Sequence, residues 1–239
     1  LHSWLSPAGR GSSFGTRSPN DLCPFRRKNT GMEFERRRDR MVERLQNRGH
    51  VERESTAEAL RAVPRHEFVP EDVRNEAYRD RPLPIGEGQT ISAPHMVAVM
   101  VERLVLDRGD EVLEIGTGCG YHAAVTAEVV GEGNVYSVEF VPELADRAQE
   151  TLDGLGYDIA VRTGDGHEGW PEHAPYDAAY LTCAAEQVPP AVVEQVRAGG
   201  RVLAPVGGAR QQLVCLTVDE DGRADRETLG GVRFVRMQG

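Results

Sequence analysis

Apolar and polar residues follow different periods along this chain, and the changes between them mark the predicted elements. Short apolar runs, typical of buried strands, lie at 112–115, 135–138, 159–162, 177–182, 201–206, 213–218 and 232–235. Segments predicted to be helical lie between them, at 121–130, 142–155 and 189–197. Strands and helices therefore alternate from residue 112 onward.

This alternation predicts an α/β fold with a doubly wound, mostly parallel sheet of seven strands covered by helices on both faces. The last two predicted strands are separated by the turn Asp219–Gly222, so we expect them to form a hairpin-like, antiparallel edge of the sheet.

The part before the sheet is predicted to be helical. A charged helix is expected at 33–48, ending at Gly49. The segment 55–58 reads as a capping box that opens a short helix ending before Pro64. Another helix is expected at 95–104, just after Pro94. Residues 32–239 thus form one domain, with a helical portion at 32–95 and a sheet portion at 96–239.

Residues 1–31 show neither period and are rich in Ser, Gly, Pro and Arg. Such a segment buries too little apolar surface to offset the entropy of ordering, so we expect it to be disordered. A helical pattern opens at Met32, so the alternative is that residues 1–31 are an upstream stretch translated or annotated by mistake, an explanation favoured over a targeting arm.

The net charge of the chain limits the kinds of partner that it can bind. The formal net charge is -10, although the first 31 residues hold five basic side chains and one acidic one. An acidic surface repels phosphate backbones, which argues against nucleic acid as a partner. Lys28 is the single lysine. Many acidic residues with almost no lysine are typical of proteins from a saline cytoplasm, and a GC-rich genome would also increase the number of arginines relative to lysines.

Cysteines and histidines give no sign of a metal site. The four cysteines are widely spaced and are expected to be reduced thiols in a cytoplasmic protein: Cys23, Cys119, Cys183 and Cys215. His167 and His173 lie six positions apart, a poor spacing for metal ligands. The longest apolar run is far shorter than the roughly 20 residues that span a bilayer, so no membrane partner is expected.

A glycine loop follows the strand at 112–115 and opens a helix. Its glycines, Gly116, Gly118 and Gly120, allow a sharp turn and a close approach to a ligand. Nicotinamide enzymes favour a GxGxxG spacing, whereas this loop has GxGxG. Glu114 before the loop suits the cationic part of S-adenosylmethionine and would repel a pyrophosphate. A tight turn without a ligand is the alternative.

Acidic residues follow two further strands. Glu139 comes 23 positions after Gly116, where its carboxylate can accept hydrogen bonds from ribose hydroxyls. Asp165-Gly166 follows the next strand and offers an acceptor for an adenine amino group, although an ordinary Asp-Gly turn is an equal interpretation. Thr182 ends the fourth strand, at the sheet edge where such ligands bind.

Several segments together resemble the protein-L-isoaspartate (D-aspartate) O-methyltransferase family, in an archaeal form. They occur in the family's order and cover roughly 33–237: RHEFVP at 65–70, PLPIGEGQTISAPHM at 82–96, VLEIGTGCGY at 112–121, GDG at 164–166, PVG at 205–207 and VRFV at 232–235. The loop 84–95 is the specific part, because GxGxG occurs in most methyltransferases of this fold. The resemblance implies a Rossmann-like class I S-adenosylmethionine-dependent methyltransferase.

The resemblance also implies roles for individual residues. Ser92 would be the active-site residue. The cofactor would be held by Glu114, Gly116, Thr117, Gly118, Gly120, Glu139, Phe140, Asp165, Gly166 and Thr182. The substrate, an isoaspartyl protein or peptide, would contact Gln89, Thr90, Ile91, Ser92, Val232 and Phe234. Departures from the family pattern are Cys119, where Ser is common, and Arg236-Met237, where Pro and an aliphatic residue are usual.

The implied reaction needs few catalytic groups. An α-carboxylate has a pKa of about 3.3–3.7, so it is ionised at neutral pH and needs no general base. The task is in-line positioning at about 3–3.5 Å, and a neutral hydroxyl such as that of Ser92 can orient the carboxylate. Alternatively, Ser92 is only the N-cap of the helix after it.

Two other functions compete. One is methylation of another small molecule, protein or nucleic acid, although 181–185 lacks the Asn/Asp-Pro-Pro-aromatic motif of many amino-methylating nucleic-acid enzymes. The other is a cofactor-binding adaptor without turnover, against which the intact Ser92 and glycine loop argue. We expect a cytoplasmic monomer.

Overall fold

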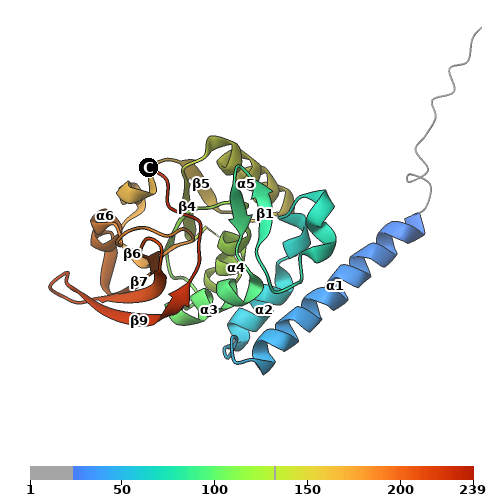
Figure 1. The fold of residues 1–239 in the computed structure, drawn as a ribbon, viewed down its shortest axis with the longest axis horizontal. Coiled ribbons are helices and arrows are strands. Elements are labelled where there is room, and N and C mark those ends of the chain that lie inside the picture. The colour runs from blue at the N-terminus through green and yellow to red at the C-terminus, as the bar shows by residue number, and fades with distance from the viewer. Residues whose placement is uncertain (1–23, 132) are drawn as a thin grey trace, which may run out of the picture.

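The computed structural model describes residues 24–131 and 133–239, and helices or 3-10 turns separate its strands from β3 to β7 (Figure 1). The main sheet consists of Val112–Ile115 (β3), Val135–Glu139 (β4), Ala160–Thr163 (β5), Tyr176–Leu181 (β6), Val196–Val206 (β7), Gln211–Val218 (β8) and Ala224–Val232 (β9). A separate hairpin consists of Leu83–Gly86 (β1) and Gln89–Ile91 (β2).

Six α-helices and four 3-10 turns complete the described part of the chain. The α-helices are Pro24–Asn47 (α1), Glu54–Ala62 (α2), Pro94–Leu104 (α3), Tyr121–Val130 (α4), Pro142–Leu155 (α5) and Pro190–Glu194 (α6). The 3-10 turns are Arg65–Glu67 (η1), Glu71–Glu76 (η2), Gly166–Glu168 (η3) and Pro171–His173 (η4). Within the described residues, no helix is both long and apolar enough to span a bilayer.

The strand order is β5-β4-β3-β6-β7-β8-β9. The first five of these strands are parallel to one another, and β8 and β9 join β7 as an antiparallel meander. The predicted mostly parallel, seven-stranded sheet with an antiparallel end is therefore confirmed. Its chain order reverses between β3 and β6, which is where ligands bind in open sheets of this kind.

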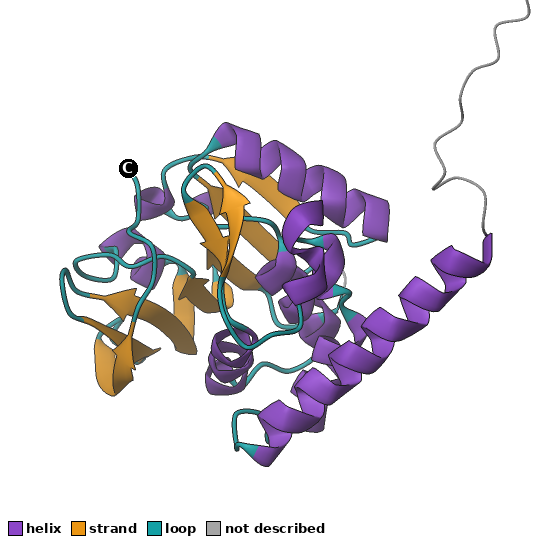
Figure 2. Ribbon diagram, turned by 45° about the vertical axis from the view of Figure 1, so that its right-hand side comes forward, coloured by secondary structure: helices purple, strands orange, loops and turns teal. Residues whose placement is uncertain are grey.

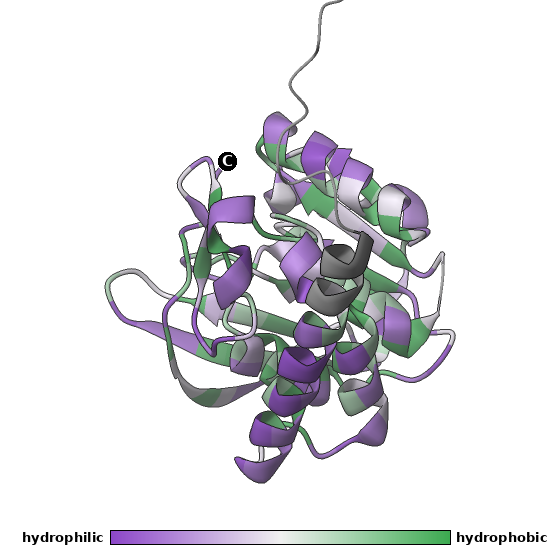
Figure 3. Cartoon of the chain, turned by 90° about the vertical axis from the view of Figure 1, so that its right-hand side faces the viewer, coloured by the Kyte–Doolittle hydropathy of each residue, from purple (hydrophilic) through white to green (hydrophobic). Residues whose placement is uncertain are grey.

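Burial falls from the centre of the sheet to its antiparallel edge. All four residues of β3 are buried, whereas most of β9 is exposed. Figure 2 shows helices on both sides of the sheet, and in Figure 3 the hydrophobic residues gather on the inner elements while the outer helices are largely hydrophilic. Parallel strands buried on both faces read as continuous apolar runs, which is why the sequence revealed them.

Helix α1 lies along α2 at one side of the molecule (Figure 1). Its buried side chains Phe34, Met41, Val42 and Leu45 recur at helical spacing. The helix begins at Pro24, so 24–31 was wrongly predicted to be disordered. Proline is favoured in the first turn because its fixed φ suits a helix and its missing N–H is not needed there. The prediction for 1–23 lies outside the described residues.

Two local predictions are wrong. Helix α2 begins at Glu54, so Ser55 lies inside it and no capping box forms; the N-cap residue Arg53 donates its backbone N–H to the Glu102 carboxylate of α3 at 3.1 Å. The last strand is β9 rather than 232–235. Its polar residues pair with β8 by backbone hydrogen bonds alone, and this exposed edge shows little of the apolar signal used to find strands. The β1–β2 hairpin was not predicted.

Candidate active site

Two adjoining cavities open at the carboxyl ends of the central strands. The inner cavity includes eight of the predicted site residues: Gln89, Thr90, Gly116, Gly118, Glu139, Phe140, Gly166 and Thr182. The outer cavity includes Thr90 and Thr182 again, together with Ser92, Val232 and Phe234. Because Thr90 and Thr182 line both, the cavities meet between the β1–β2 hairpin and the end of β6.

The glycine loop forms the floor of the inner cavity. Gly116 has a φ of +95°, and a Cβ there would lie 2.5 Å from Thr182 Oγ1. Only glycine adopts this backbone conformation readily and leaves the space open. The loop is tied to the sheet by the Gly116 N–H, which donates to the carbonyl of Val138 at 2.7 Å. The backbone can therefore approach a ligand closely.

Glu139 provides the buried carboxylate of the inner cavity. Its side chain is 6% exposed. One oxygen accepts the Gly118 N–H at 2.8 Å, and the other accepts the Val141 N–H at 3.0 Å. A carboxylate has about four lone-pair sites, so two amides leave acceptor capacity for further donors. Phe140, next to it, lines the same cavity and is 45% exposed.

Glu114 was expected to contact the cofactor, and the structure contradicts this. The side chain is fully buried and accepts hydrogen bonds from Ser137 Oγ and from Tyr180 OH at 2.9 Å. Burial raises the pKa of Glu114 to about 8. Its place in the middle of a central strand turns the carboxyl under the glycine loop and away from the cavity.

Three more predicted cofactor residues support the inner cavity rather than line it. Thr117 is buried with its hydroxyl against Ser137 Oγ at 2.6 Å, and Gly120 packs on Leu152 as it begins α4. Asp165 caps η3: its Oδ1 accepts from the N–H and the ring of His167, and the hydrogen bond from that backbone lowers the pKa of Asp165.

Gly166, the neighbour of Asp165, is the residue of that pair that reaches the cavity wall. A Cβ at Gly166 would lie 2.3 Å from Ile115 Cγ2 and 2.9 Å from Met237 Cε. The glycine therefore lets the segment after β5 close against β3 and the C-terminal segment. In this pair the structure places the glycine at the cavity wall, and the role of the Asp165 carboxylate toward the cofactor stays a prediction.

Ser92 follows the β1–β2 hairpin and lines the outer cavity. Helix α3 is capped by Ala93 without a side-chain hydrogen bond, so the interpretation of Ser92 as an N-cap is wrong. Ile91 is 4% exposed and packs in the core, which contradicts its predicted contact with ligands. Alternation along an extended chain explains the difference, since Thr90 and Ile91 point to opposite sides.

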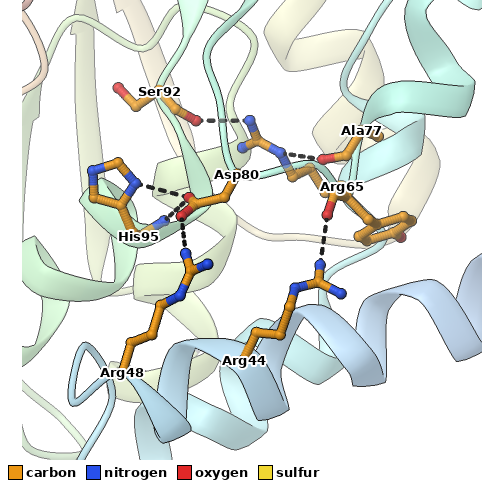
Figure 4. A network of polar contacts seen from close by, with 8 residues as sticks. Arg44, Arg48, Arg65, Ala77, Asp80, Ser92 and His95 are labelled. Atoms are coloured by element: carbon orange, nitrogen blue, oxygen red, sulfur yellow. Dashed lines mark hydrogen bonds and ion pairs between the residues drawn. The ribbon is translucent and has the colours of Figure 1, made fainter.

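Arg65 anchors the loop that carries Ser92 by a hydrogen bond to its backbone (Figure 4). It is fully buried, and it donates to the Ser92 carbonyl at 2.7 Å and to the Ala77 carbonyl at 2.8 Å. Its guanidinium lies 4.7 Å from the ring centre of Tyr121, the first residue of α4, and burial lowers the pKa of Arg65. One side chain thus ties the Ser92 loop to the helix that follows the glycine loop.

His95 and Asp80 form a second support in Figure 4. Asp80 Oδ1 accepts from the His95 N–H at 3.0 Å and is 2.8 Å from the ring Nδ1, while Oδ2 faces Arg48 at 3.3 Å. Burial opposes ionisation of Asp80, but the hydrogen bonds from His95 outweigh it and lower the pKa. His95 also lines the outer cavity.

The segment after β9 closes the outer cavity without being a strand of the sheet. Gln211 of β8 binds both backbone groups of Phe234: its Oε1 accepts the N–H at 2.6 Å, and its Nε2 donates to the carbonyl at 3.1 Å. Farther along, Ala184 pairs with the backbone of Val235 and Met237. These bonds place Phe234 at the cavity, and Val232, the last residue of β9, reaches it through its pairing with Gln211 of β8.

Comparisons with known proteins decide the family. A model of the protein-L-isoaspartate(D-aspartate) O-methyltransferase family matches residues 36–239. This chain belongs to that family. Protein-L-isoaspartate O-methyltransferase 2 of Archaeoglobus fulgidus is 52% identical over 87% of this chain and 95% of its own length. The corresponding protein of Methanopyrus kandleri is 50% identical over 86% of this chain and 93% of its own.

Solved structures agree with this assignment. A protein-L-isoaspartate O-methyltransferase superposes with a TM-score of 0.79 and 32% identity over 84% of this chain, which spans 66% of that chain. A Plasmodium falciparum protein in complex with S-adenosyl-L-homocysteine has a TM-score of 0.75 at 24% identity, a likeness that shows the shared fold. The predicted class I methyltransferase, its S-adenosylmethionine cofactor and its activity as a protein-L-isoaspartate O-methyltransferase are confirmed.

Several residues of this methyltransferase's site were not predicted, among them Arg65, His95 and Arg236. Arg65 and His95 stood inside the family-like segments, but nothing in those segments shows which carbonyl or carboxylate they reach across the fold. Arg236 was marked as a departure from the family pattern, and this was the available signal. It lines both cavities.

Proposed function

We propose that this methyltransferase holds S-adenosylmethionine in the inner cavity and methylates the α-carboxylate of isoaspartyl residues that enter through the outer cavity. The observation that carries the proposal is that the two cavities meet at Thr90 and Thr182. Thr90 lies two positions before Ser92, which lines the outer cavity. A donor and an acceptor placed in two connected cavities can meet in line, and such positioning is the main demand of this reaction.

The inner cavity has the chemistry that S-adenosylmethionine requires. Glu139 retains free acceptor sites for ribose hydroxyls, and the glycine backbone at Gly116 leaves room for a ligand. Phe140 presents an exposed apolar side chain that the adenine can cover. The buried pair of Glu114 and Thr117 then supports the loop from below and makes no contact with the cofactor.

The outer cavity serves the substrate. S-adenosylmethionine supplies the methyl group, whose bond to sulfur breaks as a carboxylate oxygen donates an electron pair to form the ester. The carboxylate is already ionised, so Ser92 and Thr90 need only orient it, and no proton is moved. The methyl ester then closes to a succinimide with loss of methanol, which starts the repair of the damaged residue.

Ser92→Ala tests this proposal. If the hydroxyl orients the carboxylate, turnover of an isoaspartyl peptide should fall about 10²-fold or more, as for the loss of a positioned polar group. Affinity for S-adenosylhomocysteine, measured by calorimetry, should change little, because Glu139 and the glycine loop bind that ligand. Ser55→Ala, on the surface of α2, is the matched control and should leave both quantities unchanged.

The substrate itself provides the second half of this test. Isoaspartate places its carboxylate on the α-carbon, one methylene nearer the main chain than the side-chain carboxylate of aspartate. A site built for it should methylate an isoaspartyl peptide and leave the matching aspartyl peptide unmodified. Equal rates on the two peptides would indicate a methyltransferase for another small molecule or protein. No transfer with cofactor bound would indicate an adaptor without turnover.

We also propose that the protein acts as a monomer in the cytoplasm. Three cysteines of the described chain, Cys119, Cys183 and Cys215, are free thiols. Burial raises the pKa of Cys119 to about 11 and that of Cys183 to about 12, so these thiols stay protonated and unreactive. Sedimentation analysis at assay concentration should give one species of 26.3 kDa, and a dimer would contradict this part of the proposal.

A further inference from the structure

The outer cavity carries an unusual charge for this chain. Arg210, Arg233 and Arg236 line it together with His95. None of its described lining residues is an Asp or a Glu. The chain as a whole has a net charge of -10, so the cavity is a cationic site on an acidic protein.

The three arginines have no acidic partner in the described part of the chain. Elsewhere, arginines of this protein commonly face carboxylates, as Arg53 faces Asp107 at 3.3 Å and Arg48 faces Asp80. Arg210, Arg233 and Arg236 are exposed, and no ion pair with a described acidic residue involves them. Their guanidinium groups are therefore available to a ligand in the cavity.

The fold brings these arginines together from two places in the sequence. Arg210 lies in the turn between β7 and β8, whereas Arg233 and Arg236 lie in the segment after β9. Arg236 approaches that turn closely: its Nη2 would be 3.6 Å from a Cβ placed on Gly208. The side-chain amide of Gln211 and the backbone of Ala184 hold the segment at both ends by hydrogen bonds, so the cluster is supported by the sheet.

Their positions distinguish the cluster from the reaction centre. Arg210 and Arg233 line the outer cavity but not the inner one, whereas Arg236 lines both. The carboxylate to be methylated must reach the junction at Thr90 and Thr182. Residues on either side of it in a peptide would then lie along the outer cavity, opposite Arg210 and Arg233. These flanking residues are the groups that the arginines can distinguish.

We propose that Arg210, Arg233 and Arg236 make this enzyme select isoaspartyl sites flanked by further Asp or Glu residues. The inference rests on the proposed function. Arginine recognises carboxylates through two parallel N–H donors, a geometry that lysine lacks. The long-range field of an acidic protein repels an acidic peptide, and the cluster reverses that field where the peptide binds. A peptide with flanking lysines meets repulsion in the cavity.

Three isoaspartyl peptides that differ only in having Glu, Gln or Lys on both sides of the isoaspartate test this. For the unmodified enzyme we expect kcat/KM to decrease in the order Glu, Gln, Lys, by roughly tenfold per step at about 0.1 M salt, where the Debye length is about 10 Å. At about 1 M salt the differences should shrink, since that length falls to about 3 Å.

The double variant Arg210→Glu/Arg233→Glu should reverse the order, so that the peptide with flanking lysines becomes the best of the three. Arg226→Glu is the control, because Arg226 is an exposed arginine of β9 that does not line the cavity. It should keep the original order. Melting curves of each variant report whether it is folded, and both sites are exposed, so we expect no loss of stability.

Each outcome has a distinct meaning. Equal rates on the three peptides would overturn the selectivity inference while leaving the proposed function intact. Arg226→Glu makes half the charge change of the double variant, so a shift in preference about half as large in this control would also overturn the inference, because net charge rather than the cavity would then set the preference. No methylation of the Gln peptide by the unmodified enzyme would instead mean that the proposed function fails.

Discussion

The inner and outer cavities adjoin, yet they are built in different ways. The inner cavity is formed by the ends of β3 and β4 and the loops that follow them, and the β1–β2 hairpin and the segment 235–238 close it; its walls include the buried side chains of Ile115 and Val138 and one buried carboxylate, that of Glu139. The outer cavity is formed by a hairpin, a turn and the segment after β9, and its charged side chains are exposed arginines.

The charges of the two cavities match the charges of their ligands. A sulfonium cofactor carries a positive charge, and the cavity proposed for it holds a carboxylate. An isoaspartyl substrate is an anion, and its cavity holds arginines. The hydroxyls of Thr90 and Thr182 line the junction where the two reacting charges would meet, and Arg236 lines both cavities beside them. Donor binding and acceptor selection can therefore be changed separately.

The strongest test of this separation is Glu139→Ala. The change removes two charge-assisted hydrogen bonds to ribose hydroxyls, at about 1.5–3 kcal/mol each, so affinity for S-adenosylhomocysteine should fall at least 10²-fold by calorimetry. It also frees the amides of Gly118 and Val141. Glu143→Ala, on the exposed first turn of α5, is the control and should bind normally. Unchanged affinity in Glu139→Ala would remove that residue from the site.

A pair of glycine variants tests the rigidity of the inner wall. Gly166→Ala places a methyl group 2.3 Å from Ile115 Cγ2, so overpacking should lower the free energy of unfolding by about 1–3 kcal/mol and weaken cofactor binding. Gly154→Ala, in α5, meets nothing within 4 Å and should stabilise the protein by about 0.4–1 kcal/mol. Denaturant melts measure both. An unchanged free energy of unfolding in Gly166→Ala would show that the cavity wall adjusts to the added methyl group.

The buried carboxyl beneath the glycine loop gives a pH-dependent prediction. The folded pKa of Glu114, about 8, lies above its ordinary value, so the folded state keeps a proton that the unfolded state loses. Stability from this group is present at low pH and is lost as the pH rises toward 8, by up to about 1.4 kcal/mol per unit. Glu114→Gln should flatten that decline in denaturant melts between about pH 5 and 8. An unchanged slope would contradict the buried, neutral state of Glu114.

Salt should have the smallest effect. Like charges repel across a protein with a net charge of -10, so added salt should raise its melting temperature by a few degrees as the Debye length shortens from about 10 to 3 Å. A larger rise would favour a saline cytoplasm over a GC-rich genome as the reason for the single lysine. Equal melting at low and molar salt would count against a saline cytoplasm.

Much of the inner cavity could be predicted from the sequence, because several of its residues come directly after buried strands. A buried parallel strand appears as an apolar run, and the loop after it must carry glycines and an acidic residue at short, regular distances. This is why Gly116, Gly118 and Glu139 were placed correctly. Glu114 was misplaced because a strand pattern gives the position of a side chain along the chain but not the partners that enclose it, here Ser137 and Tyr180.

The sheet, the glycine loop, the family and the Ser92 loop could all be identified from the sequence, since each depends on local patterns or on the order of such patterns along the chain. The three-dimensional fold was needed to show that Arg65 binds the Ser92 carbonyl and that Arg210 lines the same cavity as Arg233 and Arg236. These contacts join segments 23 or more residues apart. Hydrogen bonds between side chains and distant backbone groups, from Arg65 to Ser92 and from Gln211 to Phe234, bring the segments together, and no period in the sequence encodes such bonds.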